Sequence, residues 1–413
     1  MSSQESDRPR KRDPERIAAL LRASGSVFAE DEADLLLAEF DDDDDLERGI
    51  ERRRAGEPLE HVVGWAEFHG RRIPVGPGVF VPRRRSEFLV DRALRVLRPG
   101  DTAVELCCGA AAFAVVLADA GADVWAVDID PRATAWAARS IRVDRVLTGD
   151  LYEPLPSLLR GAVDLIVVNA PYVPTDAIAT MPSDARDFEP LVALDGGADG
   201  LDLHRRIAAG APGWLRPGGR LLIEAGERQA PVSARALTAA GLTARVVRDD
   251  EADATVVEAR MPAVAIAPGR PGDEGVRALI AAADALGLAL YGPAGYFALP
   301  IERIADERTM FLVARDPDGR AVGTAALVDH GDGTGELKRM FVAESARGLG
   351  AGSALLAAVE RAARECGIRS LVLETGPAQP EAIALYESAG FAHVPLFGPY
   401  VGSTDSVCMA KDL

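Results

Sequence analysis

The 413-residue sequence contains few cysteines, few histidines and no long apolar run. Its cysteines form no C-x-x-C pair and its five histidines have no metal-ligand spacing, which argues against a zinc site and a disulfide framework. No apolar run reaches the length of a membrane span, and residues 1–13 lack the apolar core of a signal peptide. We therefore expect a cytoplasmic protein with no metal and no membrane partner. The four cysteines, read as small buried residues, are Cys107, Cys108, Cys366 and Cys408.

Positive charge is also scarce, because 46 Lys and Arg stand against 64 Asp and Glu, for a net charge of −18. Nucleic-acid affinity depends largely on Lys and Arg that neutralise phosphates, so this balance disfavours a nucleic-acid partner. The charge is uneven along the chain. We expect the acidic run Asp41–Asp45 to be a solvated loop, and the basic tip Arg8, Arg10, Lys11 and Arg12 to belong to a disordered tail over residues 1–13.

The length and a hydrophobic content of 48% are sufficient for two or three domains with real cores. Residues 14–95 begin with apolar residues at helical spacing, which predicts a small helical and connecting region. Over residues 96–260, short apolar runs alternate with helical stretches, which predicts a parallel sheet with helices on both faces. The strands expected there are 103–106, 123–127, 164–168, 220–223 and, later, 255–259.

A stretch crowded with Pro and Gly, residues 262–272, predicts a boundary between domains. The alternation of strands and helices restarts after it, with strands expected at 311–314, 321–327, 336–342 and 370–375. Residues 261–413 are therefore predicted to form a second, independent α/β domain of ordinary size.

Acidic residues follow three successive strands of the first α/β domain. Glu105 precedes a small-residue turn that contains Cys107 and Gly109, whereas Asp128 and Asp150 end the next two strands. Ligands of open α/β sheets bind at the carboxyl ends of the strands, so we expect a nucleoside cofactor here. Asp128 would accept both ribose hydroxyls and Asp150 would contact an adenine amine. Each acid taken alone is also compatible with a helix N-cap.

The fourth strand ends in Asn169-Ala170-Pro171-Tyr172, which is the most informative stretch of the sequence. It presents an amide oxygen, a bare backbone carbonyl and an aromatic face at one point. These groups can hold a flat amine or amide, so the tetrad predicts transfer of a group onto an –NH2 nitrogen.

The strand-end residues resemble class I S-adenosylmethionine-dependent methyltransferases, and specifically the protein glutamine N-methyltransferases that modify translation release factors. The resemblance spans roughly Asp34 to Arg260 and includes the segments 56–58, 68–70, 79–83, 86–87, 188–190, 197–201 and 217–219. It implies a Rossmann-like domain that binds S-adenosylmethionine and methylates a glutamine amide nitrogen of a release factor-like protein. The cofactor residues implied are Glu105, Cys107, Gly109, Asp128, Asp150 and Asn169; the whole tetrad would bind the substrate, with Asn169 and Tyr172 catalytic.

Asn169 and the Ala170 carbonyl would accept the two amide N–H groups and hold the nitrogen lone pair on the methyl, so catalysis would consist mostly of positioning. The sequence departs from the family at Ala170, where the family has Pro, and at Ala111, where it has Gly. The segment 82–87 also departs, because it reads Pro-Arg-Arg-Arg-Ser-Glu in place of Pro-Arg-Pro-Glu-Thr-Glu. Two alternatives stay open: an N6-adenine or other nucleic-acid methyltransferase, and a non-catalytic domain that only binds S-adenosylmethionine beside an active C-terminal domain.

A glycine-rich turn, residues 347–352, lies between a strand that ends at Val342 and a predicted helix that begins at residue 353. Backbone N–H groups of such a turn bind pyrophosphate. Together with Ala-x-x-Leu-Tyr-x-x-x-Gly-Phe over residues 382–391, this turn resembles the GNAT acyltransferase superfamily across roughly Pro262 to Leu413. The resemblance implies acetyl-CoA as cofactor and N-acetyl transfer to an amine acceptor. The residues implied at the cofactor are Val342, Arg347, Gly348, Gly350 and Gly352.

For the same domain the resemblance implies that Tyr386 protonates the leaving thiolate, although a core tyrosine is the competing interpretation. Glu336 is the preferred base for the incoming amine and Glu374 the other candidate, and either is also compatible with a structural role. The sequence as a whole therefore predicts an α/β protein with three parts: an N-terminal helical unit, a Rossmann-like methyltransferase domain and a C-terminal GNAT domain.

Overall fold

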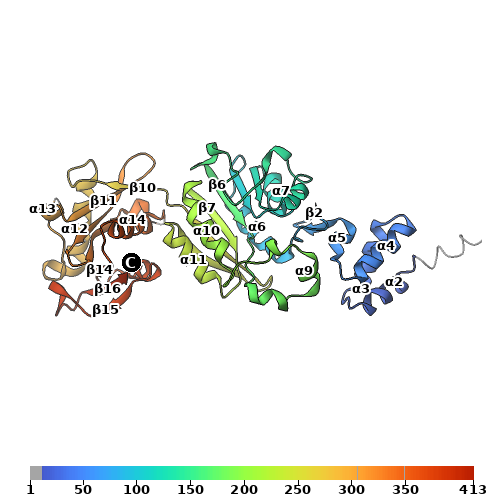
Figure 1. Ribbon diagram of the computed structural model, residues 1–413. Coiled ribbons are helices and arrows are strands. Elements are labelled where there is room, and N and C mark those ends of the chain that lie inside the picture. Colours follow the sequence, from blue (N-terminus) through green and yellow to red (C-terminus); the bar gives the residue numbers. More distant parts are fainter. Residues whose placement is uncertain (1–11, 305, 348) are drawn as a thin grey trace, which may run out of the picture.

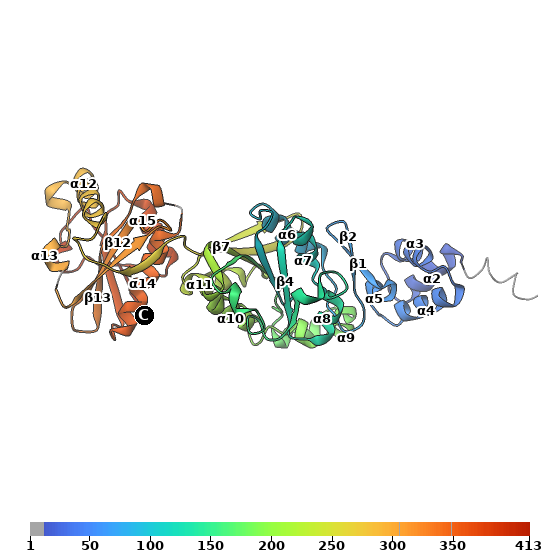
Figure 2. The ribbon, with the colours of Figure 1, turned by 90° about the horizontal axis from the view of Figure 1, so that it is seen from above.

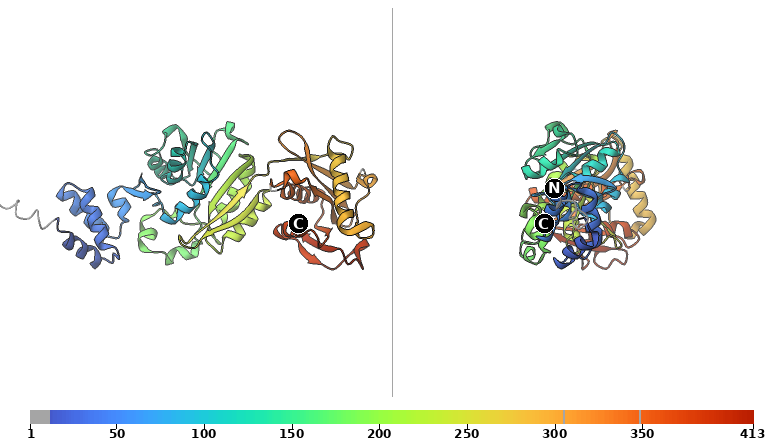
Figure 3. Two further views of the ribbon diagram at one scale, coloured as in Figure 1. Left: turned by 180° about the vertical axis from the view of Figure 1, so that it is seen from behind. Right: turned by 90° about the vertical axis from the view of Figure 1, so that its right-hand side faces the viewer.

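The computed structural model describes residues 12–304, 306–347 and 349–413. Three groups of elements follow one another along the chain: helices, a first seven-stranded sheet and a second seven-stranded sheet. Figures 1 and 2 show these groups in a row, with the first sheet in the middle, and Figure 3 shows the same order from behind. The α/β class and the order of the parts predicted from the sequence are confirmed.

Within the described residues, the N-terminal group contains four helices around a small core of its own. Ile17, Leu21, Leu36 and Leu46 are fully buried at its centre. A two-stranded antiparallel hairpin then leads toward the first sheet. The elements are α2 (Pro14–Ala23), α3 (Ala29–Glu39), α4 (Asp43–Arg54), α5 (Leu59–Val63), β1 (Trp65–Phe68) and β2 (Arg71–Pro74).

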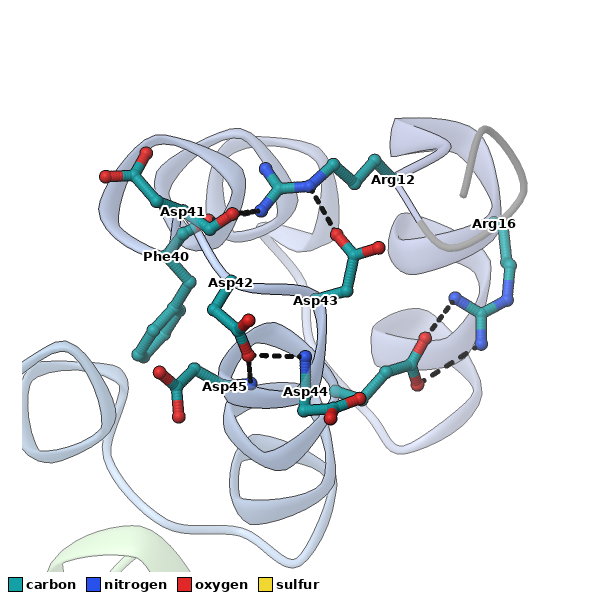
Figure 4. A network of polar contacts seen from close by, with 9 residues as sticks. Arg12, Arg16, Phe40, Asp41, Asp42, Asp43, Asp44 and Asp45 are labelled. Atoms are coloured by element: carbon teal, nitrogen blue, oxygen red, sulfur yellow. Dashed lines mark hydrogen bonds and ion pairs between the residues drawn. The ribbon is translucent and has the colours of Figure 1, made fainter. Parts of the chain in front are cut away.

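The acidic run begins a helix, so the prediction of a solvated loop was wrong (Figure 4). Asp42 is the N-cap of α4, and its Oδ1 accepts the N–H groups of Asp44 and Asp45 at 2.9 and 3.1 Å. These backbone hydrogen bonds lower the pKa of Asp42 below its usual value. Carboxylates are favoured in the first turn of a helix, where they complement the unpaired N–H groups and the positive end of the helix dipole.

Arg12 and Asp13, which were predicted to belong to the disordered tail, are ordered parts of the helical group. Arg12 binds Asp43 through Nε at 2.8 Å and donates to the Phe40 carbonyl at 2.8 Å, which ties it to the helical group (Figure 4). Asp13 caps α2 by accepting the Glu15 N–H at 3.1 Å. The other residues of the basic tip, Arg8, Arg10 and Lys11, lie outside the described residues.

The first sheet has the strand order β5-β4-β3-β6-β7-β9-β8, with β9 antiparallel to both of its neighbours. The chain passes from β3 outward to β5 and then returns to pair β6 with β3, so the strand order reverses beside β3. Such a reversal opens a crevice at the carboxyl ends of the strands. The strands are β3 (Thr102–Leu106), β4 (Asp123–Asp128), β5 (Val146–Thr148), β6 (Val163–Val168), β7 (Leu215–Glu224), β8 (Thr243–Asp249) and β9 (Ala254–Arg260).

Helices cover both faces of this sheet, as predicted (Figure 2). Two separate buried hydrophobic clusters lie against it; α7 contributes to one of them, and α10 and α11 to the other. The helices of this part are α6 (Glu87–Leu94), α7 (Ala112–Asp119), α8 (Pro131–Ala137), α9 (Ser183–Phe188), α10 (Asp202–Gly210) and α11 (Ala230–Ala239).

The second sheet has the order β10-β11-β12-β13-β14-β16-β15. β13 and β14 are parallel and pair only over residues 334–337 and 370–373, so the two strands separate beyond that point. β10 lies inside the Pro- and Gly-rich stretch that was predicted as a boundary. The strands are β10 (Ala265–Pro268), β11 (Thr309–Arg315), β12 (Ala321–Asp329), β13 (Thr334–Val342), β14 (Ser370–Thr375), β15 (Ala392–Val394) and β16 (Val407–Asp412), and the helices are α12 (Val276–Gly295), α13 (Ile301–Ile304), α14 (Ala351–Glu365) and α15 (Pro380–Ser388).

Within the described residues, α12 is the one helix that is long and apolar enough to cross a membrane, over Val276–Pro293. The sequence expectation that no run reaches this length overlooked it. Length and composition alone are weak evidence for a span. The helix contacts β12 and β13, and its regular backbone is interrupted at Gly292, where φ is 67°.

A buried histidine behind the first sheet predicts a specific dependence of stability on pH. His204 of α10 is 2% exposed, and its Nδ1 lies 2.9 Å from the Ser233 hydroxyl of α11. Burial lowers its pKa to about 4. An unfolded chain binds the proton near pH 6.5, so the contribution of His204 to stability is complete above that pH and is lost as the pH falls toward 4. We expect His204→Gln to remove up to about 3 kcal/mol of this pH dependence in urea unfolding.

The control for this experiment is His69→Gln, because His69 is partly exposed and pairs with Asp91 at the surface. It should retain the wild-type loss of stability between pH 6.5 and 4. The prediction would be contradicted if the free energy of unfolding depended on pH in the same way in the wild type and in His204→Gln.

Candidate functional sites

A cavity of about 870 Å³ opens at the carboxyl ends of β3, β4 and β6. Its volume is in the range of small-molecule and cofactor sites. All nine residues predicted for the first site line this cavity: Glu105, Cys107, Gly109, Asp128, Asp150, Asn169, Ala170, Pro171 and Tyr172. The strand-end pattern therefore identified side chains that the fold brings together.

Two buried carboxyls form one wall. Glu105 accepts the Ala114 N–H at 2.7 Å in the first turn of α7, and burial raises its pKa to about 8. Asp128 accepts the N–H groups of Gly109 and Asp130, each at 2.9 Å, and burial raises its pKa as well. The nearby charge of Asp128 adds to the rise in the pKa of Glu105, and a positively charged ligand beside the two carboxyls would stabilise their charged forms.

The turn between β3 and α7 adopts an unusual backbone without a glycine-rich sequence. Cys107, Gly109 and Ala111 have φ values of 54°, 53° and 61°. The left-handed region costs a non-glycine residue roughly 1–2 kcal/mol. Ala111 thus adopts a backbone conformation for which glycine is better suited.

Asp150 forms an ion pair with Arg206 of α10, with Oδ2 and Nη2 2.6 Å apart. Arg206 also lines the cavity. Sequence reasoning missed it, because it lies on a helix 56 residues further along and no strand-end pattern points to it.

The side-chain amide of Asn169 is oriented by a hydrogen bond. Its Nδ2 donates to the Ser86 hydroxyl at 3.3 Å. Ser86 lies beside the buried carboxyl of Glu224 at the end of β7, where it counteracts the rise in the pKa of Glu224 that burial causes. The Asn169 Oδ1 is left as an acceptor beside the cavity. Sequence reasoning gave no role to Ser86 or Glu224.

Tyr172 belongs to the same network. Its hydroxyl donates to Glu224 Oε1 at 3.2 Å and accepts from Arg85 Nη2 at 2.8 Å. Burial raises the pKa of Tyr172 to about 12, and burial also raises the pKa of Glu224. A phenol with this pKa stays protonated at neutral pH, and Tyr172 lines the cavity.

Two distant motif segments meet at the rim of the cavity. Arg83 Nη2 lies 2.5 Å from Glu189 Oε1, and the same oxygen accepts the Val81 N–H at 3.2 Å. The Glu189 side chain is fully buried. The Pro-Arg and Phe-Glu-Pro segments, more than 100 residues apart in the sequence, therefore form one wall.

The glycine-rich turn of the second sheet begins α14. Gly350 is its N-cap with φ 80°, and Gly352 faces α15, where an added Cβ would lie 3.2 Å from Leu385. Val342 ends β13, Arg347 is exposed, and Gly348 lies outside the described residues.

Glu336 lies in a polar cluster on β13 that the sequence did not reveal. The Tyr400 hydroxyl donates to Glu336 Oε1 at 2.5 Å and accepts from Lys338 Nζ at 2.7 Å. His330 Nε2 lies 3.3 Å from the other carboxylate oxygen. The other candidate base, Glu374, accepts the Ser406 hydroxyl at 2.8 Å, and burial raises its pKa.

Tyr386 lies in the hydrophobic core of the second sheet, with its ring 5.9 Å from that of Phe391. Burial raises its pKa, so the phenol stays protonated at neutral pH and remains a possible proton donor. Its core position and a donor role are compatible.

Comparison with known proteins assigns the two halves separately. The acetyltransferase (GNAT) family model matches residues 283–391. The preceding part is similar to release factor glutamine methyltransferases. The sequence is 37% identical over 227 residues to that of Cereibacter sphaeroides, covering 53% of this chain and 80% of the relative. It is 38% identical over 234 residues to that of Mycolicibacterium smegmatis, and the match covers 51% of this chain and 82% of the relative.

The enzyme of Moorella thermoacetica is 40% identical over 192 residues, which cover 44% of this chain and 66% of the relative's length. Two solved structures are also similar. An acetyltransferase of the GNAT family from Staphylococcus aureus has 20% identity and a TM-score of 0.30 over 37% of this chain and 99% of its own. A GNAT family acetyltransferase from Elizabethkingia anophelis with acetyl-CoA bound has 20% identity and a TM-score of 0.28. The match covers 37% of this chain and 99% of the chain of that structure.

The first sheet and its cavity thus define a Rossmann-like methyltransferase class, to which a C-terminal GNAT unit is joined. Within that class, the chain belongs to the release factor glutamine methyltransferase family.

Proposed function

We propose that residues 96–260 transfer the methyl group of S-adenosylmethionine to the side-chain amide nitrogen of a glutamine in a release factor-like protein. The observation that carries this proposal is the Asn169 amide, held by Ser86 at the wall of a cavity that has carboxyls at the strand ends. Transfer of tritiated methyl from S-adenosylmethionine to a release factor, with the modified residue located by mass spectrometry, tests it.

The residues of the cavity fit this cofactor. Asp128 would hold the ribose hydroxyls, Asp150 with Arg206 would face the adenine, and the buried carboxyls favour the positive charge of the methionine part. When bound, the cofactor supplies an electrophilic methyl group.

The chain's own residues prepare the nucleophile. The Asn169 Oδ1 and the Ala170 carbonyl accept the two N–H groups of the glutamine amide, while the Tyr172 ring packs on its plane. This arrangement aims the nitrogen lone pair into the cavity. Holding reacting groups in an attack geometry can contribute several kcal/mol to catalysis.

A protein substrate is favoured over a nucleic acid by the charges at the rim. Arg83 and Arg85, which line the cavity with the tetrad, are both paired with buried carboxylates, Glu189 and Glu224. Neither guanidinium therefore offers an uncompensated charge to a phosphate backbone, in agreement with the net charge of −18. We place the reaction in the cytoplasm.

The cofactor assignment predicts that Asp128→Ala weakens S-adenosylmethionine binding more than about tenfold, because two hydrogen bonds to a charged group are lost. Isothermal titration calorimetry measures the effect. Asp123→Ala is the matched control, since Asp123 lies at the opposite end of the same strand and pairs with Arg145 at the surface. A folded Asp128→Ala variant with wild-type affinity would rule out the assignment.

We further propose that residues 261–413 transfer the acetyl group of acetyl-CoA to an amine acceptor. The turn at Gly350 and the N-terminus of α14 offer a seat for the pyrophosphate, beside the point where β13 and β14 separate. Glu336 would take the proton of the attacking amine, and Tyr386 would give its proton to the leaving thiolate. Radiolabelled acetyl transfer from acetyl-CoA to a panel of primary amines tests this activity.

A further inference from the structure

A second cavity, of about 310 Å³, lies between the first sheet and the glycine-rich turn of the second. Figure 1 shows β7 on the side of the middle group that faces the second sheet. The connecting segment touches the turn directly, because the Ala263 N–H donates to the Leu349 carbonyl at 3.2 Å. The cavity is lined by Leu349 and Gly350 from the turn and, from the first sheet, by Arg220, Leu222, Thr243, Ala244, Arg245, Glu258, Ala259 and Arg260.

The sheet side of this cavity carries an excess of positive charge. Arg220 of β7 and Arg260 of β9 are direct cross-strand partners, and Thr243 of β8 stands opposite Arg260 on the other side. Like charges placed directly opposite each other in a sheet are destabilising. Burial and the nearby charge of Arg260 lower the pKa of Arg220.

The one carboxylate that lines the cavity is already shared. Glu258 binds Arg92 of α6 through Oε1 at 2.5 Å and Arg245 of β8 through Oε2 at 2.6 Å. The charges that act on Arg220 are those of Arg92, Arg245, Arg260 and Glu258. An anion between Arg220 and Arg260 would remove the repulsion, and guanidinium groups are suited to bidentate binding of phosphate.

We infer that this cavity binds the 3′-phosphorylated adenosine end of coenzyme A, so that the methyltransferase half supplies arginines to the cofactor site of the acetyltransferase half. The inference rests on the proposed acetyltransferase function. A pyrophosphate on the turn at Gly350 would lie at the mouth of the cavity, since Gly350 lines it. The next anionic group along the coenzyme is the 3′-phosphate.

The test compares coenzyme A with 3′-dephospho-coenzyme A in calorimetric titrations of the full chain. The wild type should bind coenzyme A at least about tenfold more tightly. In the double variant Arg220→Gln/Arg260→Gln, the affinity for coenzyme A should fall by about the same factor. The variant should then bind coenzyme A and 3′-dephospho-coenzyme A with equal affinity. Unchanged S-adenosylmethionine affinity would show that the first sheet still folds.

Arg235→Gln is the control, because Arg235 is exposed on α11, outside both cavities, and its loss lowers the net charge in the same direction. Inorganic phosphate should compete with coenzyme A in the wild type and not in the double variant. Equal wild-type affinities for the two ligands, or an equal loss in Arg235→Gln, would overturn the inference.

The outcomes also separate this inference from the proposed function. If coenzyme A binds and Gly350→Glu removes that binding while the arginine variant does not, only the inference fails. If neither ligand binds the wild type, the proposed acetyltransferase function fails and the inference falls with it.

Discussion

Asn169→Ala is expected to reduce methyl transfer by about 100- to 1,000-fold while S-adenosylmethionine affinity stays within a few-fold. Removing one fixed polar group that acts on the reacting atoms has a cost of this size in other enzymes. Asn169 is held by Ser86 on one side and lines the cavity on the other, so its amide oxygen should contact the substrate amide. Single-turnover transfer of tritiated methyl to a release factor, together with calorimetry of the cofactor, measures both quantities.

Two further variants make this result specific. Ser86→Ala keeps the Asn169 oxygen but removes the group that fixes its orientation, so it should lower the transfer rate by a smaller factor. Thr175→Ala is the control, because Thr175 lies three residues beyond the tetrad and its hydroxyl bonds to Asp195 at the surface. Wild-type transfer by Asn169→Ala, or loss of the cofactor in that variant, would refute the assignment.

The part of the first site that was predictable is the part encoded locally. Apolar runs mark the buried strands, and parallel strands place their carboxyl ends at one edge of a sheet. Residues as distant as Glu105 and Asn169 could therefore be assigned to one cavity from their positions after such runs.

The supporting residues were not predictable in this way. Ser86, Arg206 and Glu224 come from a short 3₁₀ turn, a helix and a later strand, and they act through partners far away in the sequence. Only the tertiary structure brings each of these residues next to its hydrogen-bond partner. The prediction for the acidic run was wrong for a different reason. Five successive aspartates obscure apolar periodicity, although an aspartate at the N-cap favours the start of a helix.

The second sheet shows the same limit. Its strands were largely foreseen, but the irregularity in β13 was not. Arg339 has a φ of 53° where the pairing of β12 with β13 shifts register between Thr324 and Ala326. The Arg339 carbonyl accepts the Thr324 hydroxyl at 2.9 Å, and its side chain donates to the Leu299 carbonyl at 2.7 Å. These contacts stabilise the left-handed backbone of Arg339, which the local sequence of the strand does not predict.

Gly350→Glu is expected to abolish acetyl-CoA binding to the full chain. Gly350 has a φ of 80° at the start of α14, a conformation that side chains rarely adopt, and an added Cβ would lie 3.1 Å from the Thr243 hydroxyl oxygen. The carboxylate would also place negative charge where the helix N-terminus would receive the pyrophosphate. Calorimetric titration with acetyl-CoA measures the loss, and titration with S-adenosylmethionine should give the wild-type affinity.

The matched control lies at the other end of the same helix. Gly367 follows α14 with a φ of 76°, and an added Cβ there meets no atom within 4 Å. Gly367→Glu therefore imposes the same left-handed strain and the same charge away from the proposed pyrophosphate seat, and it should leave acetyl-CoA binding intact. If both variants bind acetyl-CoA equally, the turn at Gly350 is not the cofactor seat. If Gly350→Glu loses S-adenosylmethionine binding to the same extent, the two halves of the chain form one cooperative unit and the proposed division at residue 261 is wrong.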